Sequence, residues 1–253
     1  MTEKKPSKKK GIYTVLMLLC IAVFLVALYK IIDIYMGYKE IDDFYNQAND
    51  DYVIQNDDGS ISYVDLDRLV KENGDIKGWI YIEGTDISYP LLQGPDNDYY
   101  LYRTYKKEYL FAGSIFIDAA NAPDLSDQHT IIYGHNMKND SMFGTLGKFK
   151  QQDYRDQHRY IYILMPGQDW NKYEIFSAYT ADIDDGTFRI FRENSEEYEK
   201  YISLATSKNM YTGIETPSSE EKIITLSTCT SDLDEQKRFV LQAILVGTVE
   251  SIE

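Results

Sequence analysis

The sequence is poor in cysteine and histidine, the residues that form disulfides and most zinc sites. It contains two cysteines and three histidines among 253 residues. Cys20 lies in an apolar stretch, so Cys229 is the single thiol of the remaining sequence and has no partner there for a disulfide. No Cys/His pair has the spacing of a zinc site, and the acidic loops around Asp96, Asp98 and 182–185 lack an EF-hand pattern. We therefore expect neither a metal nor a cofactor.

Basic residues are scarce outside the N-terminal region. Residues 1–32 hold six lysines and one acid, which leaves 20 basic and 40 acidic residues in the rest of the chain, a net charge of −20. A domain with this charge repels polyanions, so nucleic acid is excluded as a partner. Solubility is sufficient to explain the acidity.

Residues 12–32 form one long apolar run after the lysines at positions 8–10. As a helix, this run spans roughly 30 Å, the thickness of a bilayer core. The positive-inside rule places the basic tail, residues 1–11, in the cytoplasm and the domain outside. The alternative is a cleaved signal peptide, but residues 27–30 (ALYK) make a poor cleavage site. Either alternative exports the domain, and we expect an uncleaved membrane anchor.

Helical signals continue beyond the apolar run. The spacing of Ile34, Tyr38, Ile41 and Tyr45 predicts a helix over 33–50. Residues 50–62 are polar and predict a turn or linker, and 65–73 predict a second helix that begins at Asp65 and stops at Gly74. Residues 33–75 are thus an N-terminal helical region and linker, followed by a β-domain over 76–253.

Eight strands are predicted in that domain, and they suggest a mainly β fold. Their ranges are 79–82, 89–92, 114–118, 130–133, 160–164, 173–180, 223–228 and 239–249. Short strands separated by turn-rich segments are typical of a closed antiparallel or mixed barrel. Two helical insertions are predicted. One spans 142–149, and the other spans 196–207, where Tyr198, Tyr201, Ile202 and Ala205 share a face.

Cys229 ends one predicted strand, and Arg238 begins the next. If these strands pair, a guanidinium lies beside the thiol, where it could lower the pKa of the thiol and hold an oxyanion. The alternatives are an inert buried cysteine and a surface ion pair of Arg238 with Asp232 or Asp234.

The histidines differ in context. His135 follows a predicted strand and Gly134, which makes it a polar residue at a strand end. His129 precedes the same strand and His158 lies in a charged segment, and we interpret both as solvated.

Several motifs together resemble one enzyme family. Residues 225–229 (TLSTC) with Arg238 resemble the signature of sortases, and 133–143 (YGHNMKNDSMF) resemble the histidine segment of class B sortases. Residues 76–82, 89–94 and 113–118 are also similar to that class. The match runs in order from about residue 65 to 249.

The resemblance implies an eight-stranded sortase barrel and a cysteine transpeptidase of the cell surface. It assigns Cys229 to attack the threonine carbonyl of a C-terminal sorting signal and His135 to protonate the leaving amine. Arg238 and the backbone N–H of Thr230 would hold the oxyanion. The partners implied are surface proteins that bear the signal and an amine of a peptidoglycan precursor, or another pilus subunit.

Three further residues are expected to bind substrate. Ser227 lies two residues before Cys229 on the same strand face, and Asn97 and Leu101 occupy a class B pattern. The helix at 196–207 is expected to cover part of the substrate groove. Two rival functions stay open: a cysteine peptidase that releases the acyl group to water, and a membrane-tethered binding module with an inert Cys229.

Overall fold

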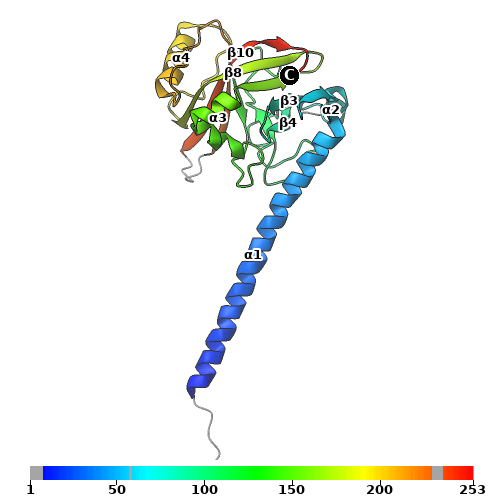
Figure 1. The fold of residues 1–253 in the computed structure, drawn as a ribbon, viewed down its shortest axis with the longest axis vertical. Helices are drawn as coiled ribbons and strands as arrows, with labels where there is room; N and C mark the ends of the chain where they lie inside the picture. The colour runs from blue at the N-terminus through cyan, green and yellow to red at the C-terminus, as the bar shows by residue number, and fades with distance from the viewer. Residues whose placement is uncertain (1–7, 57–58, 230–235, 253) are drawn as a thin grey trace, which may run out of the picture. The chain divides into compact units, whose positions relative to one another are not determined.

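The computed structural model describes residues 8–56, 59–229 and 236–252 (Figure 1). The chain divides into two compact units, Met1–Phe44 and Tyr45–Glu253.

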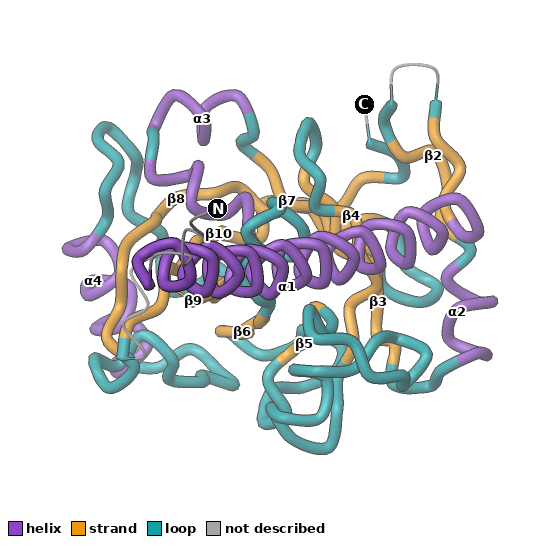
Figure 2. The backbone as a smooth tube through the Cα atoms, turned by 90° about the horizontal axis from the view of Figure 1, so that it is seen from below, coloured by secondary structure: helices purple, strands orange, loops and turns teal. Residues whose placement is uncertain are grey.

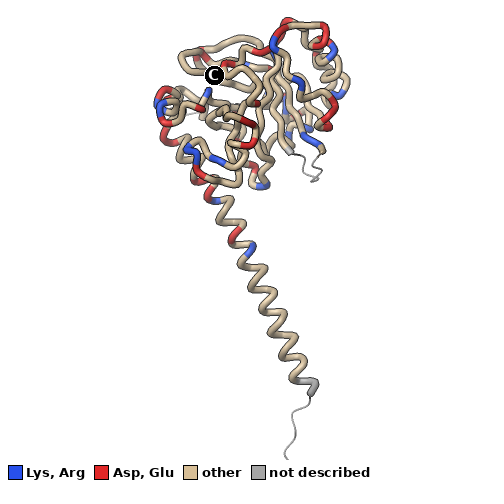
Figure 3. Tube along the Cα trace, turned by 180° about the vertical axis from the view of Figure 1, so that it is seen from behind, with Lys and Arg blue, Asp and Glu red and all other residues tan. Residues whose placement is uncertain are grey.

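A single helix, α1 (Lys8–Tyr52), accounts for the described part of the first unit and continues into the second. This helix is long and apolar enough to cross a membrane, and its most apolar window has a mean hydropathy of 2.8. Figure 3 shows the uncharged stretch of α1, which is followed by a part that carries charged residues. The predicted continuation of the apolar helix over 33–50 is confirmed.

A small hairpin replaces the linker that we expected around residues 50–62. Strands β1 (Val53–Gln55) and β2 (Ile61–Val64) pair antiparallel. Ile61 and Val64 are buried, and this burial stabilises two strands that are too short and polar to be recognised from their pattern. The helix α2 (Leu66–Glu72) follows, and Asp65 caps it by accepting a hydrogen bond from the Arg68 backbone N–H, as predicted.

Eight strands close into a barrel in the order β10-β8-β7-β3-β4-β5-β6-β9, which confirms the predicted fold class. Figure 2 shows these strands with α4 beside β8. The barrel is mixed, because β4–β5 and β6–β9 are parallel pairs and the other pairs are antiparallel. The strands are β3 (Ile76–Ile82), β4 (Ser88–Leu92), β5 (Ile115–Ile117), β6 (His129–Tyr133), β7 (Tyr160–Leu164), β8 (Trp170–Asp182), β9 (Ile223–Cys229) and β10 (Lys237–Val249).

The helical insertions follow the prediction in part. The segment predicted as a helix over 142–149 is a 3-10 helix, η1 (Gly144–Lys150), and a short helix α3 (Gln152–Gln157) follows it unpredicted. The helix α4 (Glu196–Lys208) begins at the Ser195 cap and buries the face that its periodicity predicted. That face packs against Phe176, Tyr179 and Val240 of the barrel.

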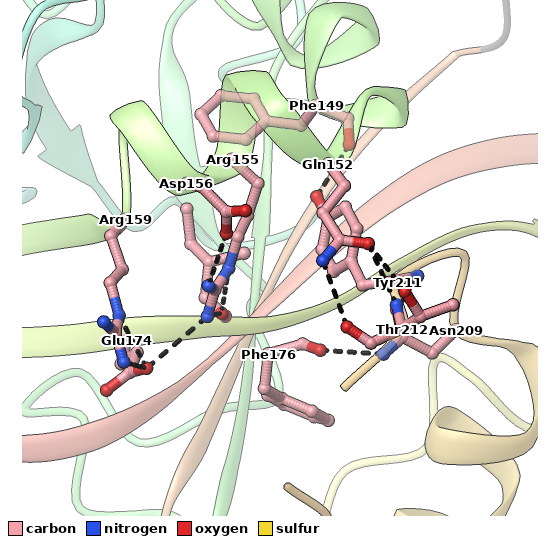
Figure 4. A network of polar contacts seen from close by, with 11 residues as sticks. Phe149, Gln152, Arg155, Asp156, Arg159, Glu174, Phe176, Asn209, Tyr211 and Thr212 are labelled. Atoms are coloured by element: carbon pink, nitrogen blue, oxygen red, sulfur yellow. Dashed lines mark hydrogen bonds and ion pairs between the residues drawn. The ribbon is translucent and has the colours of Figure 1, made fainter. Parts of the chain in front are cut away.

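A polar network fastens α3 and the segment after α4 to strand β8 (Figure 4). Arg155 is 3% exposed, and its guanidinium donates to the Ile175 carbonyl and to the Asp156 and Glu174 carboxylates. On the other side, Tyr211 donates its hydroxyl to the Phe149 carbonyl. Each of these buried polar groups therefore has a partner, which holds the outer layer in one arrangement.

Candidate active site

Strand pairing brings Cys229 and Arg238 together at one end of the barrel. Cys229 is the last residue of β9, and its Cα partner in β10 is Arg238. On the opposite flank, β9 runs parallel to β6, with Ser227 paired to Tyr133. Cys229 comes two residues after Ser227, and His135 comes two residues after Tyr133. The backbone register thus places the three predicted catalytic residues on neighbouring segments: His135 after β6, Cys229 at the end of β9 and Arg238 in β10.

His135 is held by a carbonyl rather than by a carboxylate. Its Nε2 lies 2.7 Å from the Leu101 carbonyl oxygen. Because a carbonyl oxygen only accepts, Nε2 must carry a proton, and Nδ1 is left to gain or lose the second proton. Burial lowers the pKa of His135, and the hydrogen bond to Leu101 opposes that effect in part. The site therefore favours the neutral imidazole.

The loop that follows His135 is closed on itself. Phe143 N–H donates to the His135 carbonyl at 2.9 Å, and Asn136 and Met142 form an isolated antiparallel bridge. Gly134 has no room for a side chain, since an added Cβ would lie 2.5 Å from Ile115 Cδ1. Met142 adopts a φ of 52°, a conformation that non-glycine residues rarely adopt. These contacts fix where the loop presents the imidazole.

The Arg238 guanidinium is half-buried, and its Nη1 donates to the Lys237 carbonyl at 2.9 Å. The positive charge of Arg238 also acts on the Tyr133 hydroxyl. Burial and the Asp118 carboxylate raise the pKa of the Tyr133 hydroxyl, and Arg238 opposes this rise. Asp232 and Asp234, the alternative partners of Arg238, lie outside the described residues.

The candidate substrate-binding residues occupy different environments. Ser227 is 1% exposed, and among the described residues its Oγ has no hydrogen-bond partner. The Asn97 amide is engaged, because it donates to Asp118 Oδ2 and accepts from the Ala119 N–H. Leu101 contributes its carbonyl to His135. Thr230 lies outside the described residues.

The interpretation of His129 as solvated is wrong. The residue is fully buried: its Nδ1 lies 2.6 Å from the Arg189 carbonyl, and its Nε2 lies 2.7 Å from Thr225 Oγ1 and 2.8 Å from the Tyr201 hydroxyl. Burial lowers the pKa of His129 to about 4. The cover comes from α4 and from Phe191, which are distant in sequence, so the position of His129 just before a predicted strand did not indicate its burial. His158 is half-buried, with Nδ1 2.9 Å from the Glu83 carbonyl, so it is only in part the solvated residue expected.

Sequence reasoning overlooked a polar cluster beside the site. Tyr133 donates to Asp118 Oδ2 at 2.9 Å, the same oxygen that accepts from Asn97. Tyr133 lies in the motif at 133–143 and Asp118 in the motif at 113–118, but only the pairing of β5 with β6 brings these two segments together. Over the residues that the structure describes, His, Cys, Asp and Glu form no cluster of three suited to a metal ion.

An eight-stranded barrel that gathers a cysteine, a histidine and an arginine at one end defines a sortase. The sortase domain model matches residues 80–246, and the chain belongs to the sortase family. Within the family it is a cysteine transpeptidase most like class B. It is 39% identical to sortase B of Listeria monocytogenes over 72% of this chain and 74% of the relative.

Solved structures agree with the sequence relatives. Sortase B from Bacillus anthracis in complex with AAEK2 is 34% identical, with a TM-score of 0.72 over 84% of this chain and 98% of that one. A Staphylococcus aureus sortase B–substrate complex is 27% identical, with a TM-score of 0.67 over 86% of this chain and 94% of that one.

Proposed function

We propose that this sortase cleaves a C-terminal sorting signal after its threonine and transfers the protein to an amine of a peptidoglycan precursor. The observation that supports this most is the pairing of Cys229 with Arg238 on one flank, with His135 next in register on the other. The resemblance of the His135 and Cys229 segments to class B motifs and the substrate complex of the S. aureus relative point the same way.

In the acylation step, the Cys229 thiolate forms a bond to the threonine carbonyl carbon. The oxyanion that results is stabilised by Arg238, and collapse of the intermediate breaks the peptide bond and leaves a thioester. His135 gives a proton to the leaving amine. Nδ1 is the donor atom, since Nε2 is engaged with the Leu101 carbonyl. A second amine then attacks the thioester, returns a proton to His135 and releases the thiolate.

The depressed pKa of His135 bears on the rate. The productive enzyme holds a thiolate and an imidazolium together, and burial disfavours the imidazolium. Only a fraction of molecules is then correctly protonated at neutral pH, which predicts a bell-shaped profile of kcat/KM against pH.

The test is to trap the thioester. Incubation of the full chain with a library of sorting-signal peptides should yield an acyl-enzyme by mass spectrometry, and Cys229→Ala should yield none. Adding an amine should divert the thioester from hydrolysis to the transpeptidation product. An acyl-enzyme that only water resolves would replace this proposal with a peptidase. Preference for a lysine side chain of a second protein would indicate pilus assembly instead.

Four residues are proposed to contact the peptide. They are Ser227, Thr230, Asn97 and Leu101. The buried Ser227 Oγ is unbonded among the described residues and lies two residues from the proposed nucleophile, so it is available to a substrate backbone group. Ser227→Ala should raise KM with little change in Tm, whereas a change in Tm alone would make Ser227 structural.

We also propose that α1 anchors the enzyme in the cell membrane, with the N-terminus in the cytoplasm and the barrel outside. The apolar run and the preceding lysines support this orientation. Externally added protease should digest the barrel on intact protoplasts and leave a short membrane-embedded fragment. Protection of the barrel would reverse the orientation.

A further inference from the structure

Tyr45 lies outside the proposed catalytic machinery, yet it contacts one of the two loops that hold His135 and reaches the other through Tyr89. The side chain is buried, and its hydroxyl donates to the Gly113 carbonyl and lies 3.2 Å from Ser114 Oγ. Its ring packs edge-to-face against Tyr89, with the centroids 5.2 Å apart. One residue of α1 thus contacts two segments that are far apart in sequence.

The first contact leads to the Leu101 carbonyl. Ser114 N–H donates to the Tyr100 carbonyl at 3.0 Å, and Ser114 Oγ donates to the Arg103 carbonyl at 2.8 Å. Gly113 lies so close to Leu101 that an added Cβ would be 2.2 Å from the Leu101 oxygen. Residues 113–114 therefore determine where that carbonyl points, and this carbonyl accepts the His135 Nε2 proton.

The second contact leads to the loop after His135. The Tyr89 hydroxyl accepts a hydrogen bond from the Met142 N–H at 3.0 Å. Met142 is buried with its backbone in the left-handed region, and it faces Asn136 across the loop. A strained residue keeps such a conformation only where its surroundings hold it. Tyr89 supplies one of those contacts, and Tyr45 supports the ring of Tyr89.

We propose that Tyr45 is a positioning residue for transpeptidation, which fixes together the two loops that orient the His135 imidazole. The proposal rests on the proposed role of His135 as the proton donor. The connection 93–114 is long and has no named strand among its described residues. Besides its own backbone hydrogen bonds, side chains from outside it hold its course, among them Tyr45 at the Gly113 carbonyl and Asn73 at the Tyr105 carbonyl. With Tyr45 in place, Nε2 stays on the Leu101 carbonyl and Nδ1 stays the exchanging atom.

The experiment compares Tyr45→Phe with Tyr52→Phe in the full chain in detergent. Tyr52 is a matched control, because it is buried on the same helix, donates its hydroxyl to Glu72 and packs edge-to-face against Tyr105. Tyr45→Phe keeps the ring and removes only the hydroxyl bonds. We expect kcat to fall about three- to ten-fold, the factor that one net hydrogen bond supplies, with KM changed less than about two-fold.

A second readout does not depend on turnover. With ¹⁵N-labelled histidine, NMR should show His135 as the Nε2–H tautomer in the parent chain and a mixture of both tautomers in Tyr45→Phe. Tyr52→Phe should match the parent. Parental kcat and tautomer in Tyr45→Phe would overturn the proposal, as would equal losses in both variants that follow Tm. Full activity of His135→Ala would instead refute the proposed role of His135. In that case a tautomer shift in Tyr45→Phe would still show that Tyr45 positions the imidazole.

Discussion

Arg238 and Cys229 are Cα partners in the β9–β10 ladder, although nine positions separate them along the chain. The pairing is the last of a continuous register that runs from Ile244 opposite Ile223. A slip of one residue would turn the β9 side chains to the other face of the sheet. The buried residues of both strands, such as Leu226 and Leu241, therefore also fix the spacing of the site.

Removal of the guanidinium should slow the chemistry more than it weakens binding. For Arg238→Ala we expect kcat/KM to fall by about 10²–10³-fold, as expected when a donor to an oxyanion is lost. Arg238→Lys keeps the charge without the planar fork and should recover only part of the rate. Steady-state kinetics with a sorting-signal peptide measures both, and near-normal turnover of Arg238→Ala would assign the oxyanion to other donors.

Substitution of Gly113 should damage activity beyond its effect on stability. Gly113→Ala combines a φ of +56° with a Cβ 2.2 Å from the Leu101 oxygen, so the carbonyl that holds His135 must move. Gly167→Ala is the matched control, because its φ is +71° and nothing lies within 4 Å of the added Cβ. Each change should cost about 1–2 kcal/mol of backbone strain, but only Gly113→Ala should lower kcat at matched temperature below Tm.

The buried His129 should make the fold sensitive to acid. Its pKa is lowered from 6.5 to about 4, so between these values the unfolded chain binds a proton that the folded chain does not. Stability is then complete above pH 6.5 and falls as the pH drops through this window, by up to about 3 kcal/mol. Burial of His135 adds a loss of the same sign.

Urea titrations at a series of pH values from 7.5 to 4 would measure this loss. His129→Gln should reduce the slope of unfolding free energy against pH, whatever its effect on stability at neutral pH. The same slope in both chains would mean that other groups cause the acid sensitivity.

Arg155 should matter for stability and not for chemistry. Arg155→Ala leaves the Ile175 carbonyl without its side-chain donor. We expect a loss of about 1–3 kcal/mol in the free energy of unfolding, because a buried acceptor goes unsatisfied. Arg159→Ala removes an exposed partner of Glu174 and should cost under about 1 kcal/mol. An unchanged Tm for Arg155→Ala would show that water replaces the guanidinium.

Local patterns were enough to predict most of the barrel and the buried face of α4. Tyr198, Tyr201, Ile202 and Ala205 recur at helical spacing, and the structure buries all four. The β1–β2 hairpin was not predicted, because strands this short gain their stability from burial by distant residues. Which strand pairs would be parallel also could not be read from periodicity, since a buried strand looks alike in either direction.

For the site, the order of the motifs suggested Cys229, His135 and Arg238, and strand pairing explains why they can meet. The environment of each histidine was not predictable. His129 begins β6 and His135 follows the same strand, yet α4 covers the first and the Leu101 carbonyl accepts a hydrogen bond from the second. Both contacts join residues that no local pattern connects. The contacts of Tyr45 also join distant residues, so the sequence predicted Tyr45 only as one position of a helical repeat.

The shared direction of β8 and β9, which are both antiparallel to β10, has a consequence for how such an enzyme can diversify. Because both strands run toward the catalytic end, the chain that leaves β8 must travel back along the barrel before β9 can begin. That return path carries α4. Its length and composition can therefore change from one enzyme to another while the spacing between the reacting groups, which the ladders determine, stays constant.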